Sequence, residues 1–258
     1  MTAPTPPRVL AVTGGASGIG LATATHWLAQ DPAARVVLLD LRPDTLDEAV
    51  GRLGDRARGV ATDVTDRASV DAAFASIAET ESALHGLVNC AGNFSPATTT
   101  ELEDEDWGRL IDIHLGGTLR ASRAAHDLLA ATRGAIVNLA SVAAVLGMPR
   151  RASYNSAKHG IVGLTKSLAV EWAAHGIRVN AVGPGYVLTP STAMLKERGE
   201  LDTAPLEQRI PVRRLAGAEE IAKPIAWLLG PDASYVTGHT LMVDGGMTVA
   251  GEWYPDER

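Results

Sequence analysis

Tyr154 and Lys158 lie four residues apart near the start of a predicted helix, so their side chains share one helix face. An ammonium group beside a phenol stabilises the phenolate. Lowering the pKa of a phenol from ~10 by about three units requires about 4 kcal/mol of differential interaction. We therefore expect Lys158 to lower the pKa of Tyr154 and to make this phenol an acid or base near neutral pH.

A serine precedes this pair in the sequence. Ser141 stands 13 residues before Tyr154, at the end of a predicted strand, where its hydroxyl can hydrogen-bond a substrate oxygen. Taken singly, each residue has a plainer interpretation: a turn hydroxyl for Ser141, an amphipathic core residue for Tyr154 and a solvated charge for Lys158. Their combination predicts a site for acid–base chemistry at an oxygen atom.

Glycines recur between the first predicted strand and the first helix, in the segment Thr13 to Gly20. Glycines allow a tight turn and a close approach of the backbone to a pyrophosphate, and the helix start offers free N–H groups to its charge. An ordinary strand-to-helix turn is the plainer interpretation. The pattern predicts a dinucleotide site in which Gly14, Gly18 and Gly20 form the turn.

Asp40 ends the second predicted strand, 20 residues beyond Gly20, where an acidic side chain can accept hydrogen bonds from an adenosine ribose. A turn or helix-capping aspartate is the alternative. A 2′-phosphate would place like charge against Asp40, at a cost of about 4 kcal/mol at ~4 Å and an effective dielectric of ~20. We therefore expect NAD rather than NADP, although Arg42 would offset part of the repulsion unless it is simply solvated.

Two further predicted strands end in polar or small residues. Asp63 and Val64 follow the third strand, and the run Asn89 to Gly92 follows the fourth, at the strand ends where ligands bind in open α/β sheets. Asp63 either meets the adenine or caps the following helix. Cys90, in an apolar run, is interpreted as a small buried residue rather than a reactive thiol.

Short apolar, β-rich runs alternate with helix-length segments along the chain, and several runs are continuously apolar, as in parallel strands buried on both faces. The pattern predicts an α/β fold: a Rossmann-type, doubly wound parallel sheet of seven strands with helices on both faces. The predicted strands are 9–12, 36–39, 57–61, 86–90, 135–139, 178–182 and 239–243, and the helices include 19–30, 69–79, 107–131, 152–174 and 218–229.

The chain shows no repeat, linker or low-complexity segment, so we expect a single dinucleotide-binding domain over 1–258. The segment 190–215 differs from the rest because charges cluster from Lys196 to Glu200 and no strand is predicted. Long excursions of this kind often form active-site lids, and we interpret it as a substrate lid. Residues 249–258 form a C-terminal tail.

Composition excludes several classes of protein. With 23 Lys and Arg against 30 Asp and Glu, the net charge is -7, and no basic cluster suggests a nucleic-acid partner. No apolar stretch predicts a membrane span or an export signal, so we expect no membrane partner and a cytoplasmic location. The single cysteine, Cys90, excludes an intrachain disulfide and a multi-cysteine metal site, and we expect no metal.

These segments together resemble the short-chain dehydrogenase/reductase family over Arg8 to Thr248. The resemblance rests on the glycine segment, on Asn89 to Gly92, on Ser141 with Tyr154 and Lys158, on Asn180 to Gly185 and on Val243 to Gly246. It implies that Tyr154 is the general acid/base, that Lys158 holds the nicotinamide ribose and that Ser141 orients the carbonyl. The implied cofactor-binding residues are Gly14, Ser17, Gly18, Ile19, Gly20, Asp40, Leu41, Asp63, Val64, Asn89, Ala91, Gly92, Tyr154, Lys158, Pro184, Gly185, Val187 and Thr189.

One position departs from the family pattern. The family usually has Asn where this chain has His114, and that residue helps to hold a water in a proton relay to the lysine. Because the family contact is made by the main-chain carbonyl at a helix kink, a histidine can preserve it, and we include His114 among the catalytic residues. A structural histidine and a direct proton shuttle remain open.

We therefore predict an NAD(H)-dependent oxidoreductase acting on a secondary alcohol or ketone. Asp40 and the tail pattern Val243 to Val249 resemble family members that oxidise polyols and sugar alcohols. The alternatives are a 3-oxoacyl-thioester or other ketone reductase and, from another class, a cofactor-binding regulator without turnover. Nearness to strand ends and lid suggests the substrate residues Asn93, Val142, Met148, Tyr186 and Met194, with Phe94 and Leu195 as further candidates; plain packing is the alternative for each.

The family resemblance also implies a homotetramer built through the helices 107–131 and 152–174. On the second helix, Tyr154, Lys158 and further residues share one face, and Val170 points to another surface. Trp253 and Tyr254 in the tail are expected at a subunit interface, because two aromatic side chains of ~150–250 Å² each are rarely left uncovered. A frayed terminus is the alternative.

Overall fold

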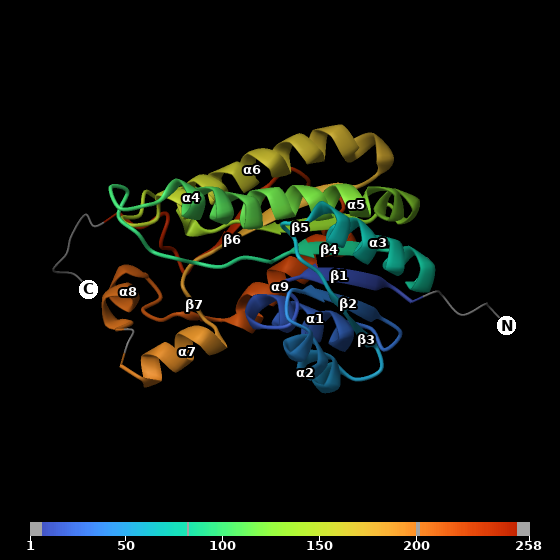
Figure 1. Ribbon diagram of the computed structural model, residues 1–258, viewed down its shortest axis with the longest axis horizontal. Coiled ribbons are helices and arrows are strands. Elements are labelled where there is room, and N and C mark those ends of the chain that lie inside the picture. The colour runs from blue at the N-terminus through green and yellow to red at the C-terminus, as the bar shows by residue number, and fades with distance from the viewer. Residues whose placement is uncertain (1–6, 82, 200–201, 252–258) are drawn as a thin grey trace.

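Seven parallel strands form one sheet in the computed structural model, which describes residues 7–81, 83–199 and 202–251 (Figure 1). Their order across the sheet is β3-β2-β1-β4-β5-β6-β9. Val12 lies opposite both Leu38 and Val88 in register. The strands are β1 (Val9–Thr13), β2 (Arg35–Asp40), β3 (Ala57–Ala61), β4 (Gly86–Asn89), β5 (Ala135–Leu139), β6 (Arg178–Pro184) and β9 (Thr240–Val243).

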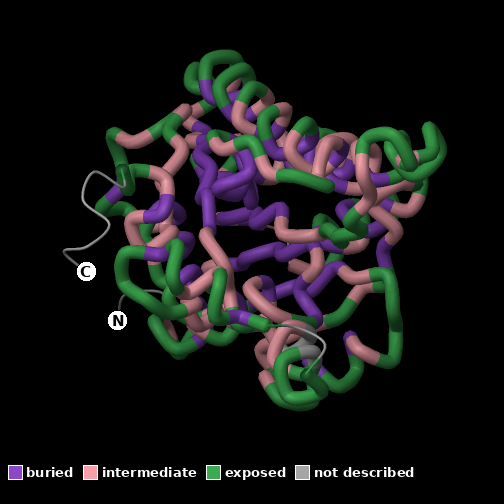
Figure 2. Tube along the Cα trace, turned by 90° about the vertical axis from the view of Figure 1, so that its left-hand side faces the viewer, coloured by how far each residue is buried: buried purple, intermediate pink, exposed green. Residues whose placement is uncertain are grey.

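The continuously apolar runs form the buried strands, as the sequence predicts. All residues of β1, β4 and β5 are buried, and Figure 2 shows buried segments concentrated in the middle of the molecule. Strand ends differ from the prediction by one or two residues: β4 ends at Asn89 rather than Cys90, and β6 continues to Pro184. The doubly wound sheet is therefore confirmed.

Helices cover both faces of the sheet (Figure 1). On one face α1 (Gly18–Gln30), α2 (Pro43–Leu53) and α9 (Ala218–Leu229) bury apolar side chains that include Trp27 and Ile225. On the other face α3 (Arg67–Glu81), α5 (Gly117–Thr132) and α6 (Ala152–Trp172) bury Phe74 and Leu168, among others. In each core, the apolar sides of the helices pack against one face of the sheet.

The sequence prediction did not include α2, although signals for it are present. Pro43 lies in the first turn and Asp44 adds an acidic residue there, while Gly54 follows the helix with φ +76°. Leu46 and Ala49 are buried at helical spacing. Because α2 buries only a narrow stripe of apolar side chains, the low overall hydropathy of this stretch did not indicate a helix.

The predicted helix 107–131 is wrong as a single continuous helix. The structure has α4 (Asp104–Ile111), a π-helical turn at Asp112–Gly116, and then α5. Arg120 stabilises this turn, since its guanidinium bonds Asp112 Oδ1 at 2.6 Å and the Val64 carbonyl at 3.1 Å. Such turns often occur at functional sites, and this one contains His114.

The predicted lid segment holds two short helices, α7 (Pro190–Glu197) and α8 (Ala204–Arg209), and no strand of the main sheet. Thr189 caps α7 and exchanges hydrogen bonds with Thr192. A small parallel pair, β7 (Val187–Leu188) and β8 (Ala216–Gly217), joins the two ends of the segment. Short 3-10 turns occupy Val142–Ala144, Ala173–His175 and Pro231–Ala233.

The C-terminal tail is described as far as Gly251, so Trp253 and Tyr254 lie outside the described residues. Val249, just before, is largely exposed. Within the described part of the chain, none of the helices combines the length and the apolar character needed to cross a bilayer.

Candidate active site

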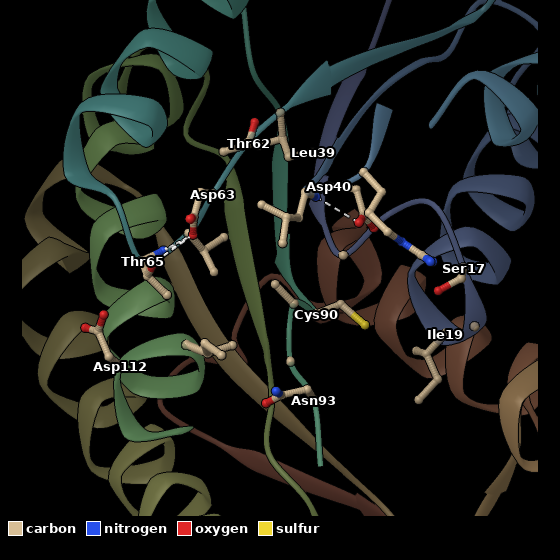
Figure 3. A pocket seen from close by; sticks show the side chains of 18 of the residues that line it. Ser17, Ile19, Leu39, Asp40, Thr62, Asp63, Thr65, Cys90, Asn93 and Asp112 are labelled. Carbon is tan, nitrogen blue, oxygen red and sulfur yellow. Dashed lines mark hydrogen bonds between the residues drawn. The ribbon is translucent and has the colours of Figure 1, made fainter. Parts of the chain in front are cut away.

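Two cavities adjoin where the carboxyl ends of the strands meet the loops. The larger, about 740 Å³, lies between the glycine segment, the ends of β2 and β3 and the start of the π-helical turn (Figure 3). The smaller, about 430 Å³, lies between the ends of β5 and β6, α6 and the lid. Both are lined by Ile19, Cys90, Gly92, Asn93 and Thr189, which places the two cavities side by side.

The glycine segment forms the floor of the larger cavity. Gly14 has φ +63°, and a Cβ there would lie 2.8 Å from the Ala91 Cα, so only glycine lets the two strand ends meet. The Thr13 hydroxyl accepts hydrogen bonds from the N–H groups of Cys90 and Ala91, which ties β1 to β4. With Gly18 at φ +52°, the loop turns directly into α1. Backbone turns of this kind at a helix start can accommodate a pyrophosphate.

Asp40 is fixed at the edge of the same cavity. Its carboxylate accepts hydrogen bonds from the N–H groups of Ala16, at 3.2 Å, and Leu41, at 2.9 Å. Figure 3 shows Asp40 among the residues that line the cavity. Leu41 and Arg42 also line the cavity. The side chain is thus held where an adenosine ribose would lie if the pyrophosphate occupied the glycine cradle.

Asp63 lines the larger cavity and orders a turn there. One carboxylate oxygen accepts hydrogen bonds from the Thr65 hydroxyl and N–H, which lowers the pKa of Asp63. The helix-cap alternative is wrong, because Asp66 caps α3 through the N–H groups of Ala68 and Ser69. The adenine-side position of Asp63 stays a prediction.

Most of the predicted cofactor residues line one of the two cavities, but Gly20 and Asn89 line neither. Gly20 packs against the Gly14 backbone. Asn89 is buried, and its amide nitrogen donates to Ser122 at 2.9 Å and to Asn138 at 2.8 Å. Its position is therefore structural, linking β4 to α5 and β5. The lining residues among those predicted are Gly14, Ser17, Gly18, Ile19, Asp40, Leu41, Asp63, Val64, Ala91, Gly92, Tyr154, Lys158, Pro184, Gly185, Val187 and Thr189.

The structure brings Ser141, Tyr154, Lys158 and His114 together around the smaller cavity. Ser141 follows β5, and its hydroxyl oxygen accepts a hydrogen bond from the Ala143 N–H at 3.1 Å. The first turns of α6 place Tyr154 and Lys158 on one face, as their spacing predicts. The Tyr154 ring contacts the rings of Phe94 and His114 edge to face, at centroid distances of 5.6 and 5.4 Å. Two aromatic contacts therefore fix the phenol.

Lys158 is buried and points toward β5. Its Nζ donates a 2.6 Å hydrogen bond to the Leu139 carbonyl and lies 5.5 Å from the Tyr154 ring centroid. Burial lowers the pKa of Lys158 to about 8, because the surroundings disfavour the charged ammonium. The lysine is therefore poised between its two protonation states near the upper end of the physiological range.

The expected lowering of the Tyr154 pKa is wrong in this structure. Burial raises the pKa of Tyr154, and the Ser141 hydroxyl and the positive charge of Arg151 offset only part of the rise. The ammonium of Lys158 is directed to the Leu139 carbonyl, so it does not determine the pKa of the Tyr154 phenol. Helix spacing predicted the shared face but not the balance of burial against charge.

His114 lies inside the π-helical turn, with its side chain in the smaller cavity. Its Nε2 lies 2.8 Å from the Asn93 carbonyl oxygen and 3.3 Å from the Asn93 nitrogen, and the shorter contact, to an acceptor, favours the proton on Nε2. Nδ1 is buried and has no hydrogen-bond partner in the described residues. Burial and the nearby Lys158 lower the pKa of His114 to about 3, so the ring is neutral. The His114 carbonyl accepts a hydrogen bond from the Thr118 hydroxyl at 2.7 Å.

The predicted substrate residues Asn93, Val142, Met148 and Tyr186 line the smaller cavity, as does Phe94. Met194 does not line it and is 48% exposed, and the side chain of Leu195 lies outside what the structure describes. Sequence reasoning missed Arg151 and Thr192, which also line this cavity. Arg151 stands three residues before Tyr154, a proximity that was available as a signal.

Cys90 is chemically quiet. Burial raises the pKa of its thiol to about 11, and the positive charge of Lys158 offsets only part of this. The thiol therefore stays protonated at neutral pH, which agrees with the expectation that it is no nucleophile. The expected full burial is wrong, because Cys90 is half-buried and lines both cavities.

Comparison with known proteins gives consistent relatives. Residues 14–248 match the family model described as Enoyl-(Acyl carrier protein) reductase. The cis-4-hydroxycyclohexanecarboxylate dehydrogenase of Sinomonas cyclohexanicum is 44% identical over 245 residues, covering 93% of this chain and 96% of the relative. The galactitol 2-dehydrogenase (L-tagatose-forming) of Cereibacter sphaeroides is 40% identical over 243 residues, covering 93% and 94%.

A solved structure described as ElxO with NADP bound superposes with a TM-score of 0.89 at 29% identity, covering 95% of this chain and all of that one (100%). The solved structure shares the fold of this chain. The two dehydrogenases are named for hydroxyl compounds, which agrees with a cavity lined by Ser141 and Tyr154.

Proposed function

The chain belongs to the short-chain dehydrogenase/reductase family, and we propose that it is an NAD(H)-dependent oxidoreductase acting on a secondary alcohol or its ketone. The observation that supports this most directly is the convergence of Ser141, Tyr154 and Lys158 on one cavity beside a glycine cradle with a fixed Asp40. When bound, the nicotinamide cofactor supplies the acceptor or donor of hydride.

The chain's own residues handle the proton and the orientation of the substrate. In alcohol oxidation, Tyr154 Oη takes the hydroxyl proton, and in ketone reduction it returns that proton to the carbonyl oxygen. Ser141 Oγ donates a hydrogen bond to the same oxygen and holds it beside the phenol. Lys158 would hold the ribose of the cofactor from the floor of the cavity, while its Nζ keeps the hydrogen bond to the Leu139 carbonyl. Phe94 and His114 fix the phenol ring by their edge-to-face contacts.

Asp40 supports the choice of NAD over NADP. Its carboxylate is immobilised by two backbone N–H groups, so it cannot turn away from a 2′-phosphate without losing both hydrogen bonds. Arg42 lines the same cavity and is exposed. We expect the repulsion between Asp40 and a 2′-phosphate to outweigh the attraction between Arg42 and that phosphate, because solvent and salt screen the exposed arginine more strongly.

For His114 we propose a positioning role rather than a proton shuttle. A ring whose pKa is lowered to about 3 gains a proton poorly at neutral pH. Its contacts instead hold the Asn93 carbonyl and the Tyr154 ring, while the Thr118 hydroxyl holds its main-chain carbonyl. His114 thus replaces the usual asparagine by filling the space beside Gly92, where a Cβ would lie 2.7 Å from its Nδ1.

The lining of the smaller cavity favours an alicyclic alcohol or ketone over an extended polyol. Phe94, Val142, Met148 and Tyr186 provide mainly apolar surface, which leaves few partners for several hydroxyl groups. One relative is named for a hydroxycyclohexanecarboxylate and another for galactitol, so both classes belong in a test. A 3-oxoacyl thioester is the third substrate class to be tested.

We also propose that the protein forms a homotetramer. A groove on the face of α4, α5 and α6 is lined by Gly108, Leu115, Leu119 and Leu164, and Leu119 is 40% exposed. Val170 of α6 is 80% exposed but does not line this groove. Apolar side chains gathered at one groove favour a second copy of this chain as the partner.

The test is a spectrophotometric assay of NADH and NADPH with cyclohexanols, polyols and 3-hydroxyacyl thioesters, run in both directions with the matching ketones. We expect turnover with NAD and at least one secondary alcohol. Tyr154→Phe should lower kcat by at least a thousandfold while NADH still binds, as followed by protein fluorescence, because it removes only the ionisable hydroxyl. The packing change Tyr186→Phe is the matched control and should leave measurable turnover. NADH binding without turnover on any substrate would instead identify a regulator.

A further inference from the structure

The smaller cavity contains a cation that the proton-transfer site does not use. Arg151 is the residue just before α6 and lines this cavity. Its guanidinium carbon lies 4.2 Å from the centroid of the Phe94 ring, and that ring contacts the Tyr154 ring edge to face at 5.6 Å. A cation over an aromatic face is held in place without being neutralised. Arg151 therefore presents a fixed positive charge on the substrate side of the phenol.

Within the described residues, no ion pair and no side-chain hydrogen bond involves the Arg151 guanidinium. Two arginines near other sites are paired instead: Arg120 with Asp112 at 2.6 Å and Arg214 with Glu220 at 2.6 Å. Charges that are partly removed from water are normally paired. Arg151 is half-buried as a residue, and its guanidinium is available to a partner that enters the cavity.

The charges around the two cavities point the same way. The smaller cavity is lined by Arg151 and Lys158 and by no Asp or Glu, in a chain whose net charge is -7. The larger cavity is lined by three aspartates, Asp40, Asp63 and Asp112, and by two arginines, Arg42 and Arg109. Lys158 already donates to the Leu139 carbonyl. Arg151 is thus the lining cation that remains for a charge on the substrate.

We propose that Arg151 anchors an anionic substrate, so that the reacting molecule is a compact secondary alcohol or ketone with a carboxylate or similar oxyanion away from the reacting carbon. This inference rests on the proposed function for the identity of the reacting group. The planar guanidinium offers two parallel N–H groups to a carboxylate. The guanidinium carbon of Arg151 lies 4.2 Å from the Phe94 ring centroid, and that centroid lies 5.6 Å from the Tyr154 ring centroid. The distance from Arg151 to the Tyr154 ring therefore cannot exceed the sum of these two distances, which suits a substrate with one saturated ring or a short chain.

Two non-reactive probes separate anion recognition from turnover. Cyclohexanecarboxylate and cyclohexanecarboxamide have the same shape, lack an alcohol and differ in charge. Calorimetric titration of the NADH-loaded protein should give a Kd at least tenfold lower for the carboxylate than for the amide. Arg151→Gln should bring this ratio below threefold, while Arg151→Lys, which keeps the charge but loses the planar fork, should give an intermediate ratio. Arg150→Gln is the matched control, because Arg150 is exposed, does not line the cavity and should leave the ratio unchanged.

Equal affinities for the two probes in the unsubstituted protein, or the same ratio after Arg151→Gln, would overturn the inference and leave Arg151 as a packing partner of Phe94. The proposed function fails separately. A protein that oxidises neutral cyclohexanols but ignores the carboxylate is an alcohol dehydrogenase without the anion site. A protein that prefers the carboxylate through Arg151 but oxidises no alcohol has the anion site without the proposed reaction.

Discussion

Lys158 Nζ and the Leu139 carbonyl oxygen are joined by a 2.6 Å hydrogen bond that crosses from α6 to the end of β5. The lysine is only 5% exposed, and burial lowers its pKa to about 8. One hydrogen bond therefore directs an ammonium group into a site that disfavours its charge. Such a residue is retained for function at the expense of stability.

Replacing this lysine should stabilise the fold while removing activity. For Lys158→Met we expect the free energy of unfolding at pH 7 to rise by ~1–3 kcal/mol, because the buried charge disappears and the apolar volume is kept. The folded-state pKa of about 8 lies below the ordinary lysine pKa of 10.5, so the unfolded chain binds more protons between these values. The free energy of unfolding of the unsubstituted protein therefore rises with pH between these two pKa values. The difference in stability between Lys158→Met and the unsubstituted protein should shrink toward pH 10.

Urea unfolding at pH 7 and at pH 10 measures both effects. Lys166→Met is the matched control, since Lys166 lies exposed on the same helix and should change little. A Lys158→Met protein less stable than the unsubstituted one at pH 7 would mean that the bond to Leu139 outweighs the burial of the charge.

His114 should limit stability in acid. The pKa of His114 is about 3 in the folded protein against an ordinary value of 6.5, so the unfolded chain binds an extra proton between these values. Stability is thus lost as pH falls from 6.5 toward 3, by at most about 1.4 kcal/mol per pH unit from this one group. His114→Asn should show a shallower loss of Tm over that range.

The pH dependence of kcat tests the positioning role of the same residue. If His114 only holds Tyr154, then His114→Asn lowers kcat without moving the apparent pKa of the kcat profile. Loss of one limb of that profile in the variant would instead support a proton shuttle. His159→Asn, on the exposed side of α6, is the control for both measurements.

The fold was predictable because its signals are local. Continuous apolar runs such as Val9 to Val12 can only be buried on both sides, and the glycine segment fixes where the first turn must lie. The site followed from the same logic, since parallel strands end at one edge and bring Ser141 to the face of α6 that holds Tyr154.

The remaining features depend on tertiary contacts. The π-helical turn is held by Arg120, which bridges Asp112 and the Val64 carbonyl, groups that come from separate segments. The direction of the Tyr154 pKa depends on how deeply the phenol is buried, which helix spacing does not specify. The position of Arg151 depends on its contact with the Phe94 ring, 4.2 Å away, which the sequence around Arg151 does not specify.

Asp40 should determine cofactor preference. We expect kcat/KM with NAD to exceed that with NADP by at least tenfold, a difference of ~1.4 kcal/mol that one fixed carboxylate can supply. Asp40→Ala should narrow the gap by relieving repulsion toward the 2′-phosphate. Arg42→Ala should widen it, because the offsetting positive charge is removed. Steady-state kinetics with both cofactors measure the ratios, and a native preference for NADP would show that Arg42 prevails.

The proposed tetramer can be tested on the groove between α5 and α6. Leu119 lines this groove and is 40% exposed. Burying a charge without a partner at an apolar interface costs several kcal/mol, so Leu119→Arg should separate subunits that pair through this face. Light scattering should then give half the native mass or less. Gly51→Arg is the control, since Gly51 is exposed on α2, where a side chain meets open space and the mass should not change. A monomeric native protein, or an unchanged mass after Leu119→Arg, would place assembly elsewhere or exclude it.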